Sequence, residues 1–200
     1  MPDRFLTDTI DAELAPGARN AIRVCLRLQP NERITIITDE ATAEIAAALQ
    51  AEVEEVGAPH AVFVLENYAE RPLTRMPKII LDDLAQSQVS IFAATTLTGE
   101  LGPRIEMTAV INKNRIRHGH MVNINRQMML EGMRADFYKV DRLSQKVIDI
   151  VRNAKEVRAT TAGGSAFTAA LNPNSMITGI GPVAFAGVER VRSISTLIAG

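Results

Sequence analysis

Short apolar runs alternate with segments of helical periodicity from residue 18 to residue 124, and this alternation restricts the chain to few folds. The runs are Arg33–Thr38, Ala61–Leu65 and Val89–Ala94, and a fourth is expected within Arg115–Ile124. Continuous apolar runs are typical of strands covered on both faces, as in a parallel sheet. Since strands and helices alternate, we predict an α/β fold with a doubly wound, mainly parallel sheet of four to five strands.

The helical segments between these runs carry recognisable faces and ends. The first, Ala18–Leu28, places one set of apolar residues on a single face: Ala18, Ala21, Ile22, Cys25 and Leu28. Asp39 fits the N-cap of a helix that runs to about Val56, and Gly57 fits the left-handed C-cap. Two further helices are expected at Pro77–Ser87 and Ile105–Lys113.

A different pattern follows the sheet segments. Asp136–Asn153 has the periodicity of one long helix, with an apolar stripe of Phe137, Val140, Val147, Ile148 and Val151. Two short runs, Glu156–Thr161 and Ala166–Leu171, then flank Gly163-Gly164, a pair that favours a hairpin turn. We expect an amino-terminal α/β domain over residues 1–154. Residues 155–200 would hold the opening β-hairpin of a second, incomplete domain and an atypical tail.

Composition argues against several classes of function. The formal net charge is -1, so no basic excess indicates binding to nucleic acid or to an anionic membrane. We expect no signal peptide, because the first residues lack an apolar core, and no membrane span, because no run reaches roughly 18 apolar residues. Cys25 is the only cysteine, which excludes an intrachain disulfide and fits a reducing, cytoplasmic setting.

Three side chains could take part in catalysis or metal binding, and each could instead have a purely structural role. Cys25 lies mid-helix on the apolar face, where a thiol is more often an inert small hydrophobe than a nucleophile. His118 and His120 would share one face of a strand, so their imidazoles could meet one metal ion. A metal site needs more ligands and none lies near in sequence, which leaves solvent contact or local hydrogen bonding as the alternative.

Hydroxyl groups follow the third expected strand. Thr95, Thr96 and Thr98 precede Gly99 at a strand's carboxyl end, and ligands of open α/β sheets dock outside those ends. The threonines could hold an anion, or they could simply form the loop, because the sequence has no glycine-rich phosphate fingerprint and no P-loop lysine. We assign no catalytic residue, and His118, His120 and the three threonines are the candidate ligand-binding residues.

Two stretches resemble the thermophilic metallo-aminopeptidase family of the aminopeptidase T type. Residues 21–58, AIRVCLRLQPNERITIITDEATAEIAAALQAEVEEVGA, show its apolar helix, turn, strand, long helix and Gly-Ala. Residues 123–171 resemble its Met-rich segment, its long helix with an Ala-Asp start, and the V-R-x-T-x-x-x-G-[ST] hairpin that opens the catalytic domain. The resemblance covers roughly Ala18–Leu171.

The resemblance implies an α/β domain followed by a peptidase domain. In that family two divalent metals of the Zn, Co or Mn type, held by carboxylates, histidines and a tyrosine, promote leucyl-type hydrolysis at the amino terminus of a peptide substrate. No position here matches those ligands, so no cofactor is expected on this chain. From Asn172 the sequence departs from the family's Gly-Asn-x-Pro-Gly-Gly-Glu-like continuation, and we expect a frameshift or truncation that leaves the chain inactive.

Two other functions stay open at this point. The chain could be a non-catalytic dimerisation or binding module. It could also be the amino-terminal domain of a metal-dependent ring-cleaving dioxygenase that shares this fold. We expect a homodimer, with no nucleic-acid or membrane partner.

Overall fold

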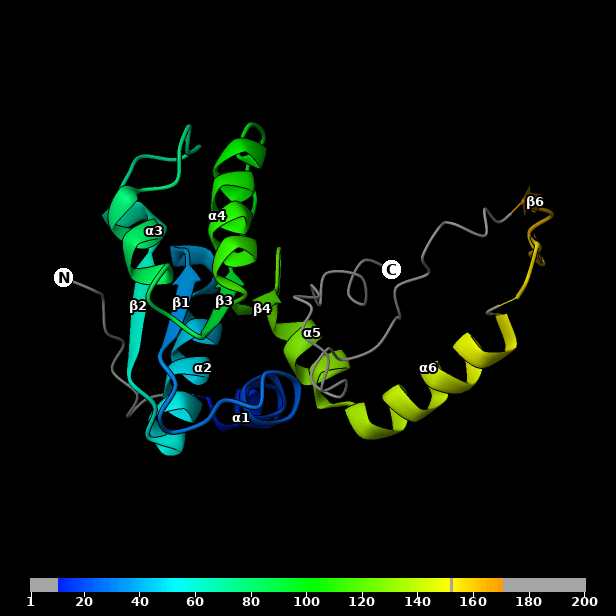
Figure 1. The fold of residues 1–200 in the computed structure, drawn as a ribbon, viewed down its shortest axis with the longest axis horizontal. Helices are drawn as coiled ribbons and strands as arrows, with labels where there is room; N and C mark the ends of the chain where they lie inside the picture. The colour runs from blue at the N-terminus through cyan, green and yellow to red at the C-terminus, as the bar shows by residue number, and fades with distance from the viewer. Residues whose placement is uncertain (1–10, 152, 171–200) are drawn as a thin grey trace. The chain divides into compact units, whose positions relative to one another are not determined.

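Four parallel strands form the sheet in a computed structural model of the chain, which describes residues 11–151 and 153–170. The strands are β1 (Ile34–Thr38), β2 (His60–Val64), β3 (Val89–Ala93) and β4 (Arg117–His120). Their spatial order is β2-β1-β3-β4. Figure 1 shows α1 (Ala15–Arg19) and α2 (Ala43–Val56) on one side of the sheet, and α3 (Lys78–Leu84) and α4 (Leu101–Asn114) on the other. The predicted doubly wound α/β fold is confirmed.

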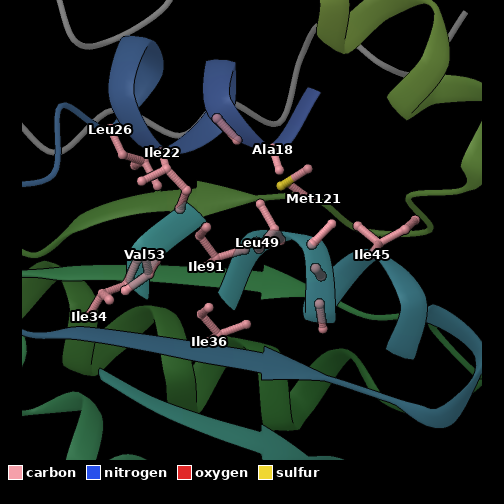
Figure 2. Close-up of a cluster of buried hydrophobic side chains, with 14 of the residues drawn as sticks. Ala18, Ile22, Leu26, Ile34, Ile36, Ile45, Leu49, Val53, Ile91 and Met121 are labelled. Atoms are coloured by element: carbon pink, nitrogen blue, oxygen red, sulfur yellow. The ribbon is translucent and has the colours of Figure 1, made fainter. Parts of the chain in front are cut away.

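Burial on both faces explains why the strands have no polar alternation. In β1, Ile34 and Ile36 pack against the helices of the first side, and Ile37 packs into the cluster of the second side. Successive strand residues point to opposite faces, so both sets must be apolar when both faces are covered. Figure 2 shows the first cluster, in which Leu49 and Val53 of α2 lie over Ile34 and Ile36 of β1 and Ile91 of β3.

The ends of the second helical segment lie where its sequence predicted. The Asp39 side chain accepts a hydrogen bond from the Thr42 backbone N–H, which caps a 3-10 turn leading into α2. Gly57 ends α2 with a φ of 78°, in the left-handed region that glycine enters without steric cost.

Three predicted boundaries are wrong. The first helical segment begins at Ala12 as a 3-10 turn, continues through α1, and ends in a π-helical turn, Asn20–Cys25. It does not reach Leu28, because Arg27 adopts a φ of 47°. Its predicted apolar face is nevertheless fully buried. α4 begins at Leu101 instead of Ile105, since Pro103 is tolerated in a first helical turn.

The fourth strand is shorter than the predicted range within Arg115–Ile124. Arg115 is the left-handed C-cap of α4, with a φ of 55°, so the strand cannot begin there. It ends at His120, and Asn123 also takes a left-handed conformation. The Met-rich segment that follows folds as α5 (Arg126–Leu130) and a 3-10 turn, Gly132–Arg134. Met129 and Met133 are buried in the first core cluster.

A second compact unit begins at Tyr138. α6 (Phe137–Val151) precedes the hairpin strands β5 (Glu156–Thr160) and β6 (Ala166–Ala170), which pair in antiparallel fashion as predicted. Gly164, with a φ of 88°, lies in the turn. No residue of α6 is buried, and Val147 of the predicted stripe is half exposed. Leu171, the expected strand end, lies outside the described residues.

No helix in the described part of the chain is both long enough and apolar enough to cross a membrane.

Gly17 of α1 tests the packing between α1 and α5. A Cβ atom at this position would lie 2.7 Å from the Met129 carbonyl oxygen and 3.2 Å from the Met133 Cβ. Gly17→Ala should therefore lower the free energy of unfolding by about 1–3 kcal/mol, measured by urea titration.

Gly102→Ala is the matched control, because its Cβ would meet no atom within 4 Å. It should raise the free energy of unfolding by up to about 1 kcal/mol, since alanine favours the helix over glycine. Equal effects of the two substitutions would contradict the close approach at Gly17.

Candidate functional site

The strand order reverses direction between β1 and β3, and ligands of open α/β sheets bind at such a point, outside the carboxyl ends of the strands. The chain runs from β1 outward to β2 and then returns to the other side of β1 as β3. Asp39 follows β1 directly, and Thr95 follows β3 by two residues. These two residues therefore lie at the expected ligand position.

The Arg71 side chain fills this position. Its guanidinium is 7% exposed and donates all five of its N–H groups. Nε and Nη2 form a bidentate pair with the Glu100 carboxylate at 2.9 and 2.6 Å. Nη2 also donates to the Thr95 carbonyl oxygen at 2.7 Å. Nη1 donates to Asp39 at 2.7 Å and to Glu66 at 3.2 Å.

The carboxylates around Arg71 bind the loops as well. Asp39, which is fully buried, accepts from the Thr42 hydroxyl at 2.6 Å and from the Thr95 backbone N–H at 2.7 Å. Glu100 accepts from the backbone N–H groups of Leu73 at 2.9 Å and Leu97 at 3.0 Å. We call Arg71, Asp39, Glu66, Thr95 and Glu100 the Arg71 cluster. It joins the ends of three strands to the start of α4.

The electrostatics of the cluster favour the charged forms of Arg71, Asp39 and Glu100. The hydrogen bonds from Arg71 lower the pKa of Glu100 to about 2, although burial opposes this. Burial alone would raise the pKa of Asp39, but hydrogen bonds from Thr42, Thr95 and Arg71 outweigh it and lower that pKa. The pKa of Arg71 is raised, chiefly by its hydrogen bonds to Glu100. Three carboxylates against one guanidinium leave the cluster with a net charge of -2.

The three candidate threonines divide between structural contacts and solvent. The Thr95 hydroxyl and backbone N–H both donate to Asp39. The Thr96 backbone N–H donates to the Asn123 side-chain oxygen at 2.9 Å, which connects the ends of β3 and β4. Thr98 is exposed. Thr95 and Thr96 therefore stabilise the loops, and only Thr98 points to solvent.

His118 and His120 share one face of β4, as predicted, with ring centroids 5.3 Å apart. The Nδ1 atom of His118 hydrogen-bonds the Ser90 hydroxyl at 2.8 Å, and its Nε2 atom hydrogen-bonds Nδ1 of His120 at 3.1 Å. Burial, and next the charge of His120, lower the pKa of His118 to about 3. Burial, and next the charge of Arg104, lower the pKa of His120. Both imidazoles are thus neutral near pH 7.

The hydrogen-bonded series Ser90–His118–His120 offers little scope for catalysis or metal binding by itself. Ser90 beside His118 has the contact of a nucleophile and its base, but Ser90 is fully buried and no substrate reaches it. Both nitrogens of His118 are engaged, which leaves Nε2 of His120 as the ligand atom without a partner in the described chain. Residues 11–151 and 153–170 hold no group of three or more histidine, cysteine, aspartate or glutamate side chains suited to a metal ion.

Arg71 and Glu100 are the residues that sequence reasoning missed. Both lie in loops without periodicity, and the contacts of Arg71 with Asp39 and Glu100 span 32 and 29 residues. The available signal was positional, because Asp39, Glu66 and Thr95 each follow a strand of the predicted parallel sheet. Those ends meet at one edge, where a buried counter-charge was needed.

Comparison with known proteins shows similarity of fold only. No protein-family model matches the chain, and no curated protein matches it in sequence. Among solved structures, 2,5-dihydroxypyridine dioxygenase from Pseudomonas putida has a TM-score of 0.57 and 12% identity over 84% of this chain and 49% of that protein. AmpT from Thermus thermophilus has a TM-score of 0.48 and 11% identity over 77% of this chain and 58% of that protein. The chain thus spans about half the length of these proteins.

Glu100 should make stability depend on acidic pH. Its pKa is lowered in the folded state, so its contribution is complete above its ordinary pKa of 4.5 and is lost as the pH falls toward about 2. Glu100→Gln should lower the free energy of unfolding at pH 7 by about 2–3 kcal/mol and flatten its decline between those pH values. Urea titrations across this range measure both effects.

Glu55→Gln is the control, because Glu55 is 62% exposed in its pair with Arg23. Its effect at pH 7 should stay below about 1 kcal/mol. A Glu100→Gln profile parallel to that of the unsubstituted chain would show that Glu100 is not stabilised by Arg71.

Cys25 is 4% exposed, and burial raises the pKa of its thiol to about 12. We expect a water-soluble disulfide reagent at pH 8 to react with the native chain roughly a hundredfold more slowly than with the chain in urea, since reaction needs local opening and a thiolate. Absorbance of the released thiol gives both rates. Similar rates would mean that Cys25 is accessible and could act as a nucleophile.

Proposed function

We propose that this chain is the amino-terminal portion of a metal-dependent leucyl-type aminopeptidase, and that the portion itself performs no hydrolysis. The order of elements carries the proposal: a parallel α/β sheet, a Met-rich segment, the long helix α6 and the hairpin β5–β6 follow one another. This is the order of the family that residues 21–58 and 123–171 resemble.

The described residues do not fit the two-metal site of that family. A co-catalytic pair needs several convergent carboxylates and imidazoles around two cations roughly 3.5–4 Å apart. The described chain has no such group, and the carboxylates nearest to the switch point are engaged by Arg71. In this proposal the metals and the peptide substrate bind outside the described residues, and no catalytic step is assigned to the α/β unit.

The position of Arg71 supports a structural, non-catalytic role for the α/β unit. In many open α/β sheets the switch point receives a substrate or cofactor. Here it holds a guanidinium whose donors are all engaged. The unit would then position and assemble the enzyme, as a homodimer working in the cytoplasm.

One alternative is favoured by a specific observation. The dioxygenase likeness has the higher TM-score and covers more of this chain than the AmpT likeness. At 12% identity it establishes the fold alone, so a ring-cleaving enzyme stays the second candidate.

The gene sequence after codon 171 and two assays distinguish these functions. For an aminopeptidase, we expect one of the reading frames to encode the family's Glu, His, Asp and Tyr ligands. The protein read through that frame should hydrolyse leucine anilide with Zn²⁺, Co²⁺ or Mn²⁺, and a chelator should abolish the hydrolysis. Cleavage of 2,5-dihydroxypyridine with an added divalent metal and no leucine-anilide turnover would favour the dioxygenase.

The 200-residue chain is the matched control. After dialysis it should retain less than one equivalent of metal by elemental analysis and give no turnover above background. Two retained equivalents, or turnover that a chelator abolishes, would contradict the placement of the metals. No ligand-coding frame after codon 171 would favour a non-catalytic binding or dimerisation module.

A further inference from the structure

Arg104 of α4 is a half-buried arginine without a counter-charge. Its Nε atom is buried and has no hydrogen-bond partner, and its guanidinium forms no ion pair with any residue of the described chain. Other arginines around the sheet are paired: Arg33 with Asp83, Arg71 with three carboxylates, and Arg117 with Glu32. A partly desolvated cation costs free energy unless an anion accompanies it. Arg104 therefore lacks a partner of negative charge.

His120 lies at the carboxyl end of β4, on the face of the sheet that α4 covers with Arg104 in its first turn. The His120 ring stacks on Phe92 of β3, with centroids 5.8 Å apart. α4 packs on the same cluster as Phe92 through Met107, and Arg104 lies one helical turn before Met107. Burial, and next the charge of Arg104, lower the pKa of His120, in keeping with this placement of α4 over the end of β4.

The hydrogen bonds behind His120 fix the direction of its free nitrogen. Nδ1 of His120 is bonded to His118, which Ser90 anchors in the core. Nε2 of His120 has no partner in the described chain, and the ring is only partly buried. When Ser90 donates to His118 and His118 donates to His120, Nε2 of His120 carries a proton and can donate outward.

We propose that Arg104 and His120 form a binding subsite for a small carboxylate at the carboxyl end of β4. The guanidinium supplies the charge and paired N–H donors that suit a planar carboxylate, and the imidazole supplies a third donor. The Arg71 cluster, with its net charge of -2, includes Glu100, four residues before Arg104, so a monovalent anion is favoured over a divalent one. The subsite does not depend on the proposed peptidase function.

Acetate is the probe, and the histidine resonances report its binding. The chain has three histidines, so the imidazole C2–H signals of His60, His118 and His120 can be assigned individually by substitution. At pH 7.5 and constant ionic strength, acetate should shift the His120 signal to saturation and leave the His60 signal unmoved. Phosphate at equal ionic strength should bind more weakly.

Substitutions at Arg104 test the assignment. Arg104→Gln should weaken acetate binding at least about tenfold, because a charge-assisted hydrogen-bond donor is lost. Arg104→Lys keeps the charge without the planar fork and should weaken binding by a smaller factor. Lys113→Gln, an exposed change of the same charge on the same helix, should leave binding unchanged.

Three results would overturn the subsite. These are an unshifted His120 signal, Arg104→Gln binding equal to that of the unsubstituted chain, and an equal loss in Lys113→Gln, which would mean a nonspecific effect of charge. Tighter binding of phosphate than of acetate would overturn the carboxylate class. Circular dichroism and the amide spectrum of each variant verify the fold, and Arg104→Lys keeps the test valid if Arg104→Gln is misfolded.

Discussion

The Arg71 guanidinium determines how the carboxyl edge of the sheet is built. The segments after β1, β2 and β3 and the start of α4 each present an oxygen atom to it. Without the guanidinium, the buried carboxylates of Asp39 and Glu100 would face each other, and that of the partly exposed Glu66, with no counter-charge. Buried ion pairs often add little stability compared with an apolar replacement, so we interpret the cluster mainly as fixing the positions of these segments.

The fold could be predicted because its signals are local. An apolar run such as Val89–Ala94 is buried on both faces whatever its partners are, and Asp39 caps the 3-10 turn that leads into α2 at Ala43. The end of α4 and the start of β4 were harder to predict. They depend on Arg115, a residue type that carries no sequence signal for a left-handed conformation but ends the helix in one.

The sequence predicted where the candidate site lies in the fold, but not which side chains contact one another there. Strand-end residues were recognised, but the role of Asp39 as an Arg71 ligand depends on a contact across 32 residues. For His118, alternation along the strand gave the shared face with His120. Its second partner, Ser90, comes from the neighbouring strand β3. Together with the contact to His120, that bond engages both ring nitrogens of His118, and the spacing alone could not distinguish such a hydrogen-bond chain from a metal pair.

The hairpin of the second compact unit also depends on contacts that its local sequence does not provide. Strand register places Val157, Ala159, Phe167 and Ala169 on one face of the β5–β6 hairpin. Phe167 is 59% exposed there, and Ile150 of α6 is 80% exposed. Two-stranded sheets are marginal on their own, and an apolar face gains stability only when it is covered. Because the first unit has two closed core clusters and this hairpin has none among the described residues, the hairpin has the character of a strand pair from a larger sheet.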